Sequence, residues 1–273
     1  MISPSELMSH YRRLIEALIP SVIAAGDAIL AIRIAGHTVE TKEDISPVTN
    51  ADHAAEAILL TAISKHAPDI PVLAEEEVAA GRVPALGDVF FAVDALDGTR
   101  DFIEGGTDFT VNIGLIRDTQ PIAGIVSAPA LGLLWVGVVG HGARRLDIRA
   151  AGMPETGISV RPPPENGIHI VASRSHRSPE TDDFIARFPH ARIVAAGSSL
   201  KLVRIAEGAA DLYPRLGPTS LWDIAAGDAV LTAAGGRVTD LDGRHLVYRP
   251  RNDQAKPFLN PWFVATGGFD PFS

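Results

Sequence analysis

The sequence predicts an α/β (α+β) fold in which layers of helices and sheets alternate. Two observations predict it. Segments whose apolar residues recur at helical spacing alternate with short apolar runs typical of strands, and this mixed order continues along the whole chain. The length agrees with it, because 273 residues of which 46% are hydrophobic suffice for one large domain or two small ones around a buried core.

The helices are expected in two groups. Apolar residues recur at helical spacing from Leu7 to Val22, so the chain opens with a helix that Pro20 kinks or restarts. A second helix over residues 51–66 follows the start signals Pro47 and Asn50, which places Asp52 in its first turn. Later helices are expected at residues 180–188, 199–207 and 223–234.

The strands are expected where short apolar runs are bounded by turn residues. Runs at residues 71–73 and 89–93 both end in carboxylates. The uncharged stretch 122–140 is nearly long enough to cross a bilayer, but Pro129 divides it into two runs that a β-hairpin explains better, so no integral membrane segment is expected. Further strands are expected at residues 109–116, 122–127, 133–138, 168–172 and 192–195.

Composition divides the chain and excludes several kinds of site. A Gly- and Pro-rich stretch over residues 150–166 suggests an N-terminal half, 1–155, and a C-terminal half, 156–273. With no cysteine, disulfides and Cys-ligated zinc are excluded, so a metal would sit on oxygen or histidine. The net charge of −9 argues against nucleic acid polymers as partners. The N-terminus lacks the features of a secretory signal, so a cytoplasmic location is expected, with peripheral attachment at the inner membrane left open.

The segment FFAVDALDGTRDF carries the first candidate site. An apolar strand delivers Asp94, and Asp97 follows three residues later, an arrangement of oxygen ligands that suits Mg²⁺. The backbone N–H groups of Gly98 and Thr99 open a short helix and are placed to bind a phosphate, while the Thr99 hydroxyl is placed to orient a water. The structural alternatives are a simple Asp-Gly turn and an N-cap at Thr99.

Other acidic residues are candidates for the same site. Glu75 opens a run of three glutamates directly after a strand; such a run is otherwise a solvated charged edge. Asp223 precedes a small-residue helix, for which an N-cap is the structural alternative. If these two converged with Asp52, Asp94 and Asp97, their repulsion near neutral pH would require cations or strongly raised pKa values. Clustering would therefore indicate a metal site.

A few basic and polar residues could complete a phosphate site. Lys201 lies three residues after Ser198, so one helical turn brings both to the same helix entrance. Lys42, Arg215 and His176 are further candidates, and ordinary surface charge is the alternative for each.

These residues, in this order, resemble the lithium-sensitive, magnesium-dependent phosphatase superfamily that includes inositol monophosphatase and fructose bisphosphatase. Within it the chain looks most like the bacterial 3'(2'),5'-bisphosphate nucleotidases of sulfate assimilation, the CysQ type. The segments SPVTNAD, DGTRDFIEGGTDFTVNIGLI, SRSH, GSSLKLVRIAEGAADLYPRLGPTSLWD and FLNPWF carry the resemblance. One departure is Ala95, where the family motif usually has proline.

The resemblance implies an inositol monophosphatase-like sandwich and a role for each candidate residue. Two or three Mg²⁺ ions would be bound: the first by Glu75, Asp94 and the Leu96 carbonyl, the second by Asp94, Asp97 and Asp223, with Asp52 in reach of a third. Glu75 and Thr99 would activate the nucleophilic water, and Gly98 and Thr99 would bind the scissile phosphate. The nucleoside and its other phosphate would contact His176, Ser198, Lys201 and Arg215.

The implied reaction is hydrolysis of the 3'-phosphate of adenosine 3',5'-bisphosphate, with 3'-phosphoadenylyl sulfate as a second substrate. One alternative is an inositol-phosphate or sugar-phosphate phosphatase on the same fold. The other is a metal-dependent nucleotide-binding regulator without catalysis. Lys201 and Arg215 distinguish the two enzymes, because a second phosphate needs basic groups that a polyol monophosphate does not.

Overall fold

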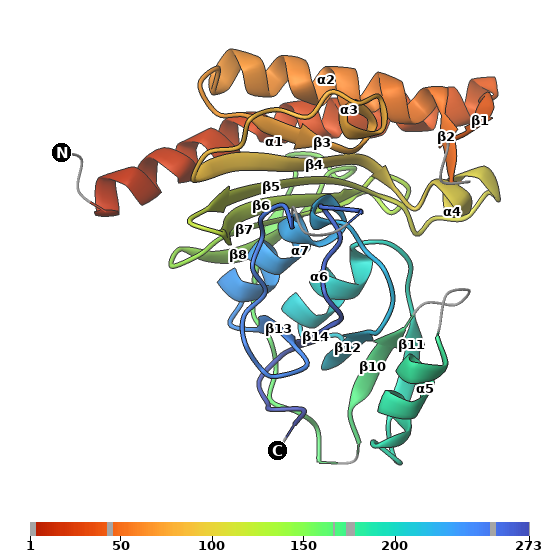
Figure 1. The fold of residues 1–273 in the computed structure, drawn as a ribbon, viewed down its shortest axis with the longest axis vertical. Helices are drawn as coiled ribbons and strands as arrows, with labels where there is room; N and C mark the ends of the chain where they lie inside the picture. Colours follow the sequence, from red (N-terminus) through yellow and green to blue (C-terminus); the bar gives the residue numbers. More distant parts are fainter. Residues whose placement is uncertain (1–3, 43–45, 166, 173–177, 252–254, 273) are drawn as a thin grey trace.

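Helices and sheets stack in alternating layers in the computed structural model, which describes residues 4–42, 46–165, 167–172, 178–251 and 255–272. From top to bottom in Figure 1, α1 (Pro4–Ala35) and α2 (Asn50–His66) cover a seven-stranded sheet. Below that sheet lie α6 (Leu200–Ala206) and α7 (Leu221–Ala233), then a five-stranded sheet, and finally α5 (Pro179–Ala186). The predicted fold class is confirmed.

The larger sheet has the strand order β3-β4-β5-β6-β7-β8-β9. Only β3 and β4 pair in parallel; every later neighbour is antiparallel, as expected for strands joined by short hairpins. The strands are β3 (Val72–Ala74), β4 (Val89–Asp97), β5 (Thr110–Arg117), β6 (Gln120–Ala128), β7 (Leu133–Val138), β8 (Gly142–Asp147) and β9 (Glu155–Ile158).

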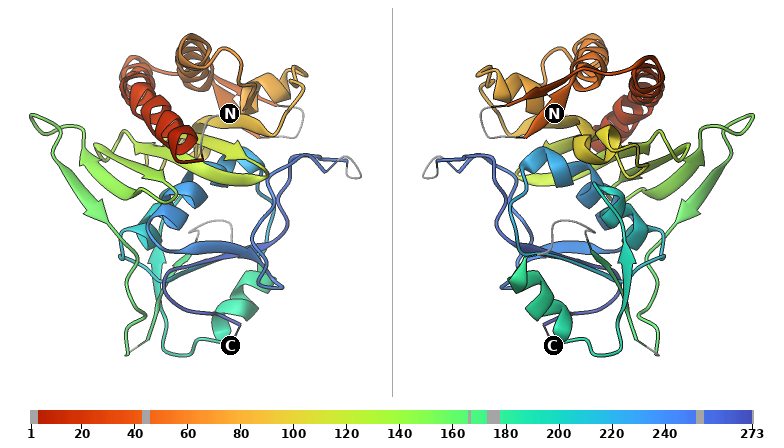
Figure 2. Two further views of the ribbon diagram at one scale, coloured as in Figure 1. Left: turned by 90° about the vertical axis from the view of Figure 1, so that its left-hand side faces the viewer. Right: turned by 90° about the vertical axis from the view of Figure 1, so that its right-hand side faces the viewer.

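The smaller sheet, in the C-terminal half, has the order β11-β10-β12-β14-β13. Its strands are β10 (His169–Ala172), β11 (Arg192–Ala195), β12 (Leu212–Arg215), β13 (Arg237–Asp240) and β14 (Phe263–Thr266). The remaining elements are the hairpin of β1 (Val39–Thr41) with β2 (Pro47–Thr49) and the short helices α3 (Glu75–Ala79) and α4 (Thr99–Ile103). Seen from the side in Figure 2, the sheets remain separate layers with α7 between them.

The predicted hairpin over residues 122–140 is confirmed, because β6 and β7 pair antiparallel from Ala123↔Val138 to Ala128↔Leu133. The opening helix, by contrast, is not restarted at Pro20, which lies inside the unbroken α1. Pro20 removes one helical hydrogen bond, but it is exposed and the helix continues past it.

By length and composition alone, α1 could cross a membrane from Glu6 to Ala35, with a mean hydropathy of 1.9 in its most apolar window. It packs on α2 and β6, however, and Ile15, Leu18 and Ile29 are fully buried in the core. A long core helix has the same composition, so this is weak evidence for a membrane segment. The cytoplasmic location stays a prediction.

Small residues let α7 lie unusually close to the larger sheet. A Cβ added at Gly124 on β6 would lie 2.3 Å from the Ala226 carbonyl oxygen, and one at Gly114 on β5 would lie 2.9 Å from the Ala225 Cβ. Side chains at these positions would push the helix away from the sheet. The glycines therefore allow the first turn of α7 to approach the end of β4, where Asp94 lies.

The predicted division after residue 155 falls at the start of β9, the last strand of the larger sheet. The core crosses this point, since one apolar cluster joins Phe90 and Trp135 of that sheet with Tyr213 and Phe263 of the smaller sheet. The division into halves stays a prediction.

Candidate active site

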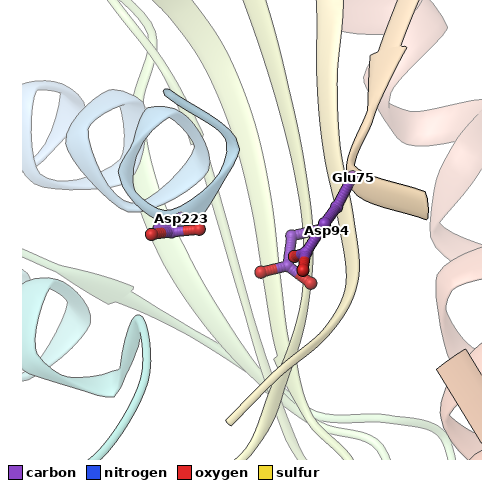
Figure 3. Close-up of side chains that lie close together, drawn as sticks. All are labelled: Glu75, Asp94 and Asp223. Atoms are coloured by element: carbon purple, nitrogen blue, oxygen red, sulfur yellow. The ribbon is translucent and has the colours of Figure 1, made fainter. Parts of the chain in front are cut away.

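Three carboxylates from three different elements meet at one point between the larger sheet and α7. Glu75, Asp94 and Asp223 each place an oxygen within 4.8 Å of the others (Figure 3). They come from the start of α3, the end of β4 and the first turn of α7. Residues 148 positions apart along the chain thus form one acidic cluster, which contains three of the five carboxylates that the sequence grouped as one candidate site.

Asp94 lies where β4 becomes irregular. The pairing of β4 with β5 shifts between Asp94 and Asp97, so the strand continues to Asp97 instead of ending at residue 93 as predicted. The Leu96 N–H donates to Asp94 Oδ1 at 3.0 Å, and the Thr99 hydroxyl lies 3.1 Å from the Leu96 carbonyl oxygen. These hydrogen bonds hold the turn that contains Ala95.

Asp223 is the third residue of α7, and its structural role differs from the predicted N-cap. Ser220 caps the helix, and its N–H donates to Asp223 Oδ2 at 2.8 Å. This is the Asp form of a capping box, which the spacing Ser-x-x-Asp in the sequence already signals. One oxygen of Asp223 is therefore used for capping, and the other is available to the cluster.

Glu75 and Glu76 are not part of a solvated edge. Lys42 reaches both and donates to Glu75 Oε1 and Glu76 Oε1 at 2.6 Å each. Glu76 is only 7% exposed, and its N–H donates to Glu56 Oε2. Glu77 alone fits the solvated reading, since it pairs with Arg82 at the surface.

The electrostatics of this cluster favour a bound cation. Burial, followed by the charges of Glu75 and Asp97, raises the pKa of Asp94 well above its ordinary value. Burial and the same neighbours raise the pKa of Asp223. For Glu75, burial outweighs the Lys42 charge and raises the pKa to about 7. A cation that neutralised these carboxylates would remove their mutual repulsion, and an all-oxygen donor set suits Mg²⁺.

A second observation fits an ion with its hydration water. Asn112 on β5 is the cross-strand partner of Asp94 and is fully buried, yet neither polar atom of its side-chain amide has a hydrogen-bond partner in the described part of the chain. Unsatisfied buried amides are costly and usually bind ordered water. The side-chain amide of Asn112, next to Asp94, could therefore bind such a water.

Asp52 and Thr99 form a hydrogen-bonded pair beside the cluster. Asp52 is buried in the first turn of α2 as predicted; its Oδ2 accepts from the Thr49 N–H and hydroxyl, and its Oδ1 lies 3.1 Å from the Thr99 hydroxyl. Thr99 is not an N-cap, because Gly98 occupies that position with φ 95°. Only glycine adopts this conformation readily, and a Cβ there would lie 2.9 Å from the Asp108 carbonyl oxygen.

Asp97 lies on the side of the site that faces the C-terminal half. Its Oδ2 accepts from the Ser198 hydroxyl at 2.6 Å and has the Ser199 hydroxyl at 3.4 Å. Ser198 has φ 51°, a conformation that non-glycine residues seldom adopt and that often marks a functional position. Asp97 is therefore near the acidic cluster but held by serines of the other half.

One cavity of about 700 Å³ joins the acidic cluster to a basic side. Lys201 is only 6% exposed; its Nζ donates to the Ser198 carbonyl oxygen at 2.8 Å and lies 5.4 Å from the centroid of the Tyr213 ring. Arg215 donates to the Pro218 carbonyl oxygen, while its Nε is buried without a partner in the described residues. Neither is an ordinary surface charge.

The cavity brings together most of the predicted site residues that the structure describes. Asp52 lies behind Thr99, and His176 falls outside the described residues. Tyr213, whose ring centroid lies 5.4 Å from the Lys201 Nζ, is one of several cavity residues that the sequence did not predict, although Arg215 of the same strand was predicted. The predicted residues that line the cavity are Glu75, Asp94, Leu96, Asp97, Gly98, Thr99, Ser198, Lys201, Arg215 and Asp223.

The sequence pattern of the inositol monophosphatase family matches residues 10–265, nearly the whole chain. The chain belongs to this family. The match includes every element that contributes to the cavity, so the resemblance inferred from separate motifs is confirmed over the length that those motifs span.

Among individual relatives, 3'(2'),5'-bisphosphate nucleotidase CysQ of Salmonella typhimurium is 40% identical over 251 residues, which are 89% of this chain and 95% of that protein. The structure of CysQ from Bacteroides thetaiotaomicron superposes with a TM-score of 0.76 at 31% identity, over 94% of this chain and 97% of the other. An inositol monophosphatase from Anabaena gives 0.74 at 26% identity, over 96% and 93%. The fold of this family member thus matches both enzyme types.

Proposed function

We propose that this protein hydrolyses the 3'-phosphate of adenosine 3',5'-bisphosphate to AMP and phosphate in sulfate assimilation, and acts on 3'-phosphoadenylyl sulfate by the same route. One observation carries the proposal: a single cavity has the carboxylates Glu75, Asp94 and Asp223 on one side and the buried cation Lys201 with Arg215 on the other. A substrate with two phosphates can use both sides. The high identity to CysQ nucleotidases supports the same choice.

The acidic side would hold Mg²⁺. Glu75, Asp94 and the Leu96 carbonyl would bind one ion, and Asp94, Asp97 and Asp223 a second, with Asp52 in reach of a third. Bound there, such ions would lower the pKa of a water and stabilise the charge that develops on the leaving oxygen. Two or three ions also explain how a protein with a net charge of −9 binds a polyanion.

The chain's own residues position the reacting groups. Gly98 and Thr99 open α4, so their N–H groups are placed to bind the scissile phosphate. The Thr99 hydroxyl, within 3.1 Å of Asp52 Oδ1, orients the attacking water and gives its proton a route towards a carboxylate. Glu75 is the second candidate acceptor for that proton. The water oxygen would bond to phosphorus as the bond to the 3' oxygen breaks; one water proton would pass to the carboxylate, and the leaving 3' oxygen would take up a proton from solvent.

The basic side would bind the rest of the substrate. Lys201 and Arg215 are placed for the 5'-phosphate, and the Ser198 hydroxyl for the ribose or a phosphate oxygen. His176, outside the described residues, stays a proposed contact of the nucleoside. An inositol or sugar monophosphate has no second phosphate to neutralise the Lys201 ammonium. We therefore favour the nucleotide.

The test compares phosphate release from adenosine 3',5'-bisphosphate and from inositol 1-phosphate with Mg²⁺ present. We expect kcat/KM to be clearly higher for the nucleotide. A preference for the inositol ester would replace the proposal with the polyol phosphatase. A protein that bound the nucleotide, by calorimetry, but released no phosphate from either ester would instead be the non-catalytic regulator.

A further inference from the structure

A segment near the C-terminus, residues 258–260, runs along the loop that precedes α7. The Leu221 N–H donates to the Phe258 carbonyl oxygen at 2.9 Å, and the Asn260 N–H donates to the Thr219 carbonyl oxygen at 2.8 Å. Ser220 and Leu259 pair between these bonds as an isolated antiparallel bridge. Residues 258–260 thus hold residues 219–221, at the start of α7, through backbone hydrogen bonds.

The side chain of Asn260 adds a second set of bonds to the same loop. Its Nδ2 donates to the Ser220 carbonyl oxygen at 2.6 Å and to the Thr219 hydroxyl oxygen at 3.2 Å. Asn260 is only 8% exposed, so these bonds form away from bulk water, where an unmatched partner is costly. One amide group therefore fixes two successive residues of the loop.

That loop in turn orients groups on both sides of the cavity. The Ser220 N–H donates to Asp223 Oδ2 at 2.8 Å, which sets the direction of the carboxylate in the acidic cluster. The carbonyl oxygen of Pro218 accepts from Arg215 Nη2 at 2.7 Å, which sets the guanidinium on the basic side. Thr219 itself lines the cavity. Residues 218–220 are thus the shared support of a proposed metal ligand and a proposed phosphate ligand.

We propose that Asn260 is a positioning residue of this site: through residues 218–220 it fixes Asp223 towards the metal and Arg215 towards the second phosphate. Asn260 does not line the cavity, so it acts only through this loop. For Arg215 the inference rests on the proposed function, whereas for Asp223 it needs only metal binding. Removal of groups that orient metal ligands typically weakens metal affinity or activity by about 10- to 100-fold.

The experiment compares Asn260→Ala with a control that loses a buried hydrogen bond elsewhere. In Tyr248→Phe the lost bond is the one from the Tyr248 hydroxyl to Asp228 Oδ2, 2.7 Å long, and neither residue lines the cavity. Mg²⁺ affinity is measured by calorimetry without substrate, KM and kcat with the bisphosphate, and stability by urea unfolding. Thr219→Val, which removes one acceptor of the Asn260 amide together with a hydroxyl of the cavity wall, is the second variant if Asn260→Ala does not fold, and its Mg²⁺ affinity without substrate is the deciding constant.

We expect Asn260→Ala to weaken Mg²⁺ binding by about 10-fold or more and to raise KM for the bisphosphate by a similar factor. Thr219→Val should show a smaller loss in the same direction, and Tyr248→Phe should stay within about twofold of the wild type in both. If the Asn260 or Thr219 variants lost stability but kept both constants, Asn260 would be merely structural and the inference overturned. If the wild type did not cleave the bisphosphate while Asn260→Ala still weakened Mg²⁺ binding, the proposed function would fail and the positioning of Asp223 would stand.

Discussion

Replacing Lys201 by Met tests whether the basic side of the cavity reads a second phosphate. Met is similar to Lys in length but removes the ammonium, which lies 5.4 Å from the centroid of the Tyr213 ring in a residue that is only 6% exposed. A hydrogen bond to a charged group contributes about 1.5–3 kcal/mol, which corresponds to about 10- to 150-fold in kcat/KM. We therefore expect a loss of this size for adenosine 3',5'-bisphosphate. Adenosine 3'-monophosphate, which lacks the 5'-phosphate, should lose less than about threefold.

The assay is phosphate release from both nucleotides at pH 7 with saturating Mg²⁺. Equal losses on the two substrates would refute the reasoning, because Lys201 would then act on the reaction itself, through the Ser198 carbonyl that it holds at 2.8 Å. The pH dependence provides an independent check. Burial lowers the pKa of Lys201 to about 8, against the opposing effect of the Asp97 charge. As the pH rises through about 8 the ammonium loses its proton, so wild-type kcat/KM for the bisphosphate should fall there, while Lys201→Met should not show this fall.

Three further predictions concern the acidic site, the packing of α7 and a buried carboxylate. Asp97→Asn should abolish turnover while urea unfolding shows nearly unchanged stability, and surviving activity would contradict the metal assignment. Gly124→Ala should destabilise the fold by about 1–3 kcal/mol in urea unfolding, since its Cβ would lie 2.3 Å from the Ala226 carbonyl oxygen; an unchanged midpoint would show that α7 can move away without cost. Burial raises the pKa of Asp228 to about 6, so its contribution to stability is fully present below its unfolded pKa near 4 and is lost as the pH rises to about 6. Asp228→Asn should remove this part of the pH dependence, about 3 kcal/mol between pH 4 and 7, and an unaltered stability profile would refute the shift.

The sequence predicted the elements whose hydrophobic pattern is strong. Strands at residues 133–138 and 192–195 have the expected bounds, and α2 starts one residue before the expected position. Two of the missed strands carry weak signals: β12 contains Pro214, which argues against a strand, and β8 is a largely polar segment, GARRLD. β12 pairs with β10 and β14, and β8 pairs with β7 and β9, and local patterns do not report these pairings.

The acidic residues of the site were predictable, but their surroundings were not. The run of glutamates looked solvated because three consecutive charges usually lie at the surface, whereas Lys42, 33 residues upstream, forms an ion pair with Glu75. The capping role of Asp223 was misplaced by three residues, because the serine that caps the helix was not considered together with the aspartate that completes the box. The surroundings of Glu75 depend on tertiary contacts, which the sequence does not show. The capping role of Asp223 could have been read from the Ser-x-x-Asp spacing.

Asp52 and Asp223 occupy the same position in two different helices, and this shared geometry links folding to chemistry. Each is the third residue of its helix and uses Oδ2 to accept from the backbone N–H of the capping residue, Thr49 or Ser220. The second oxygen of Asp52 then accepts from Thr99, and that of Asp223 faces the acidic cluster. Asparagine can still accept a hydrogen bond through its Oδ1 but carries no charge. Replacing either aspartate by asparagine should therefore preserve the start of its helix but abolish phosphate release. Measuring stability and activity in these two variants separates the role of each aspartate in folding from its role in catalysis.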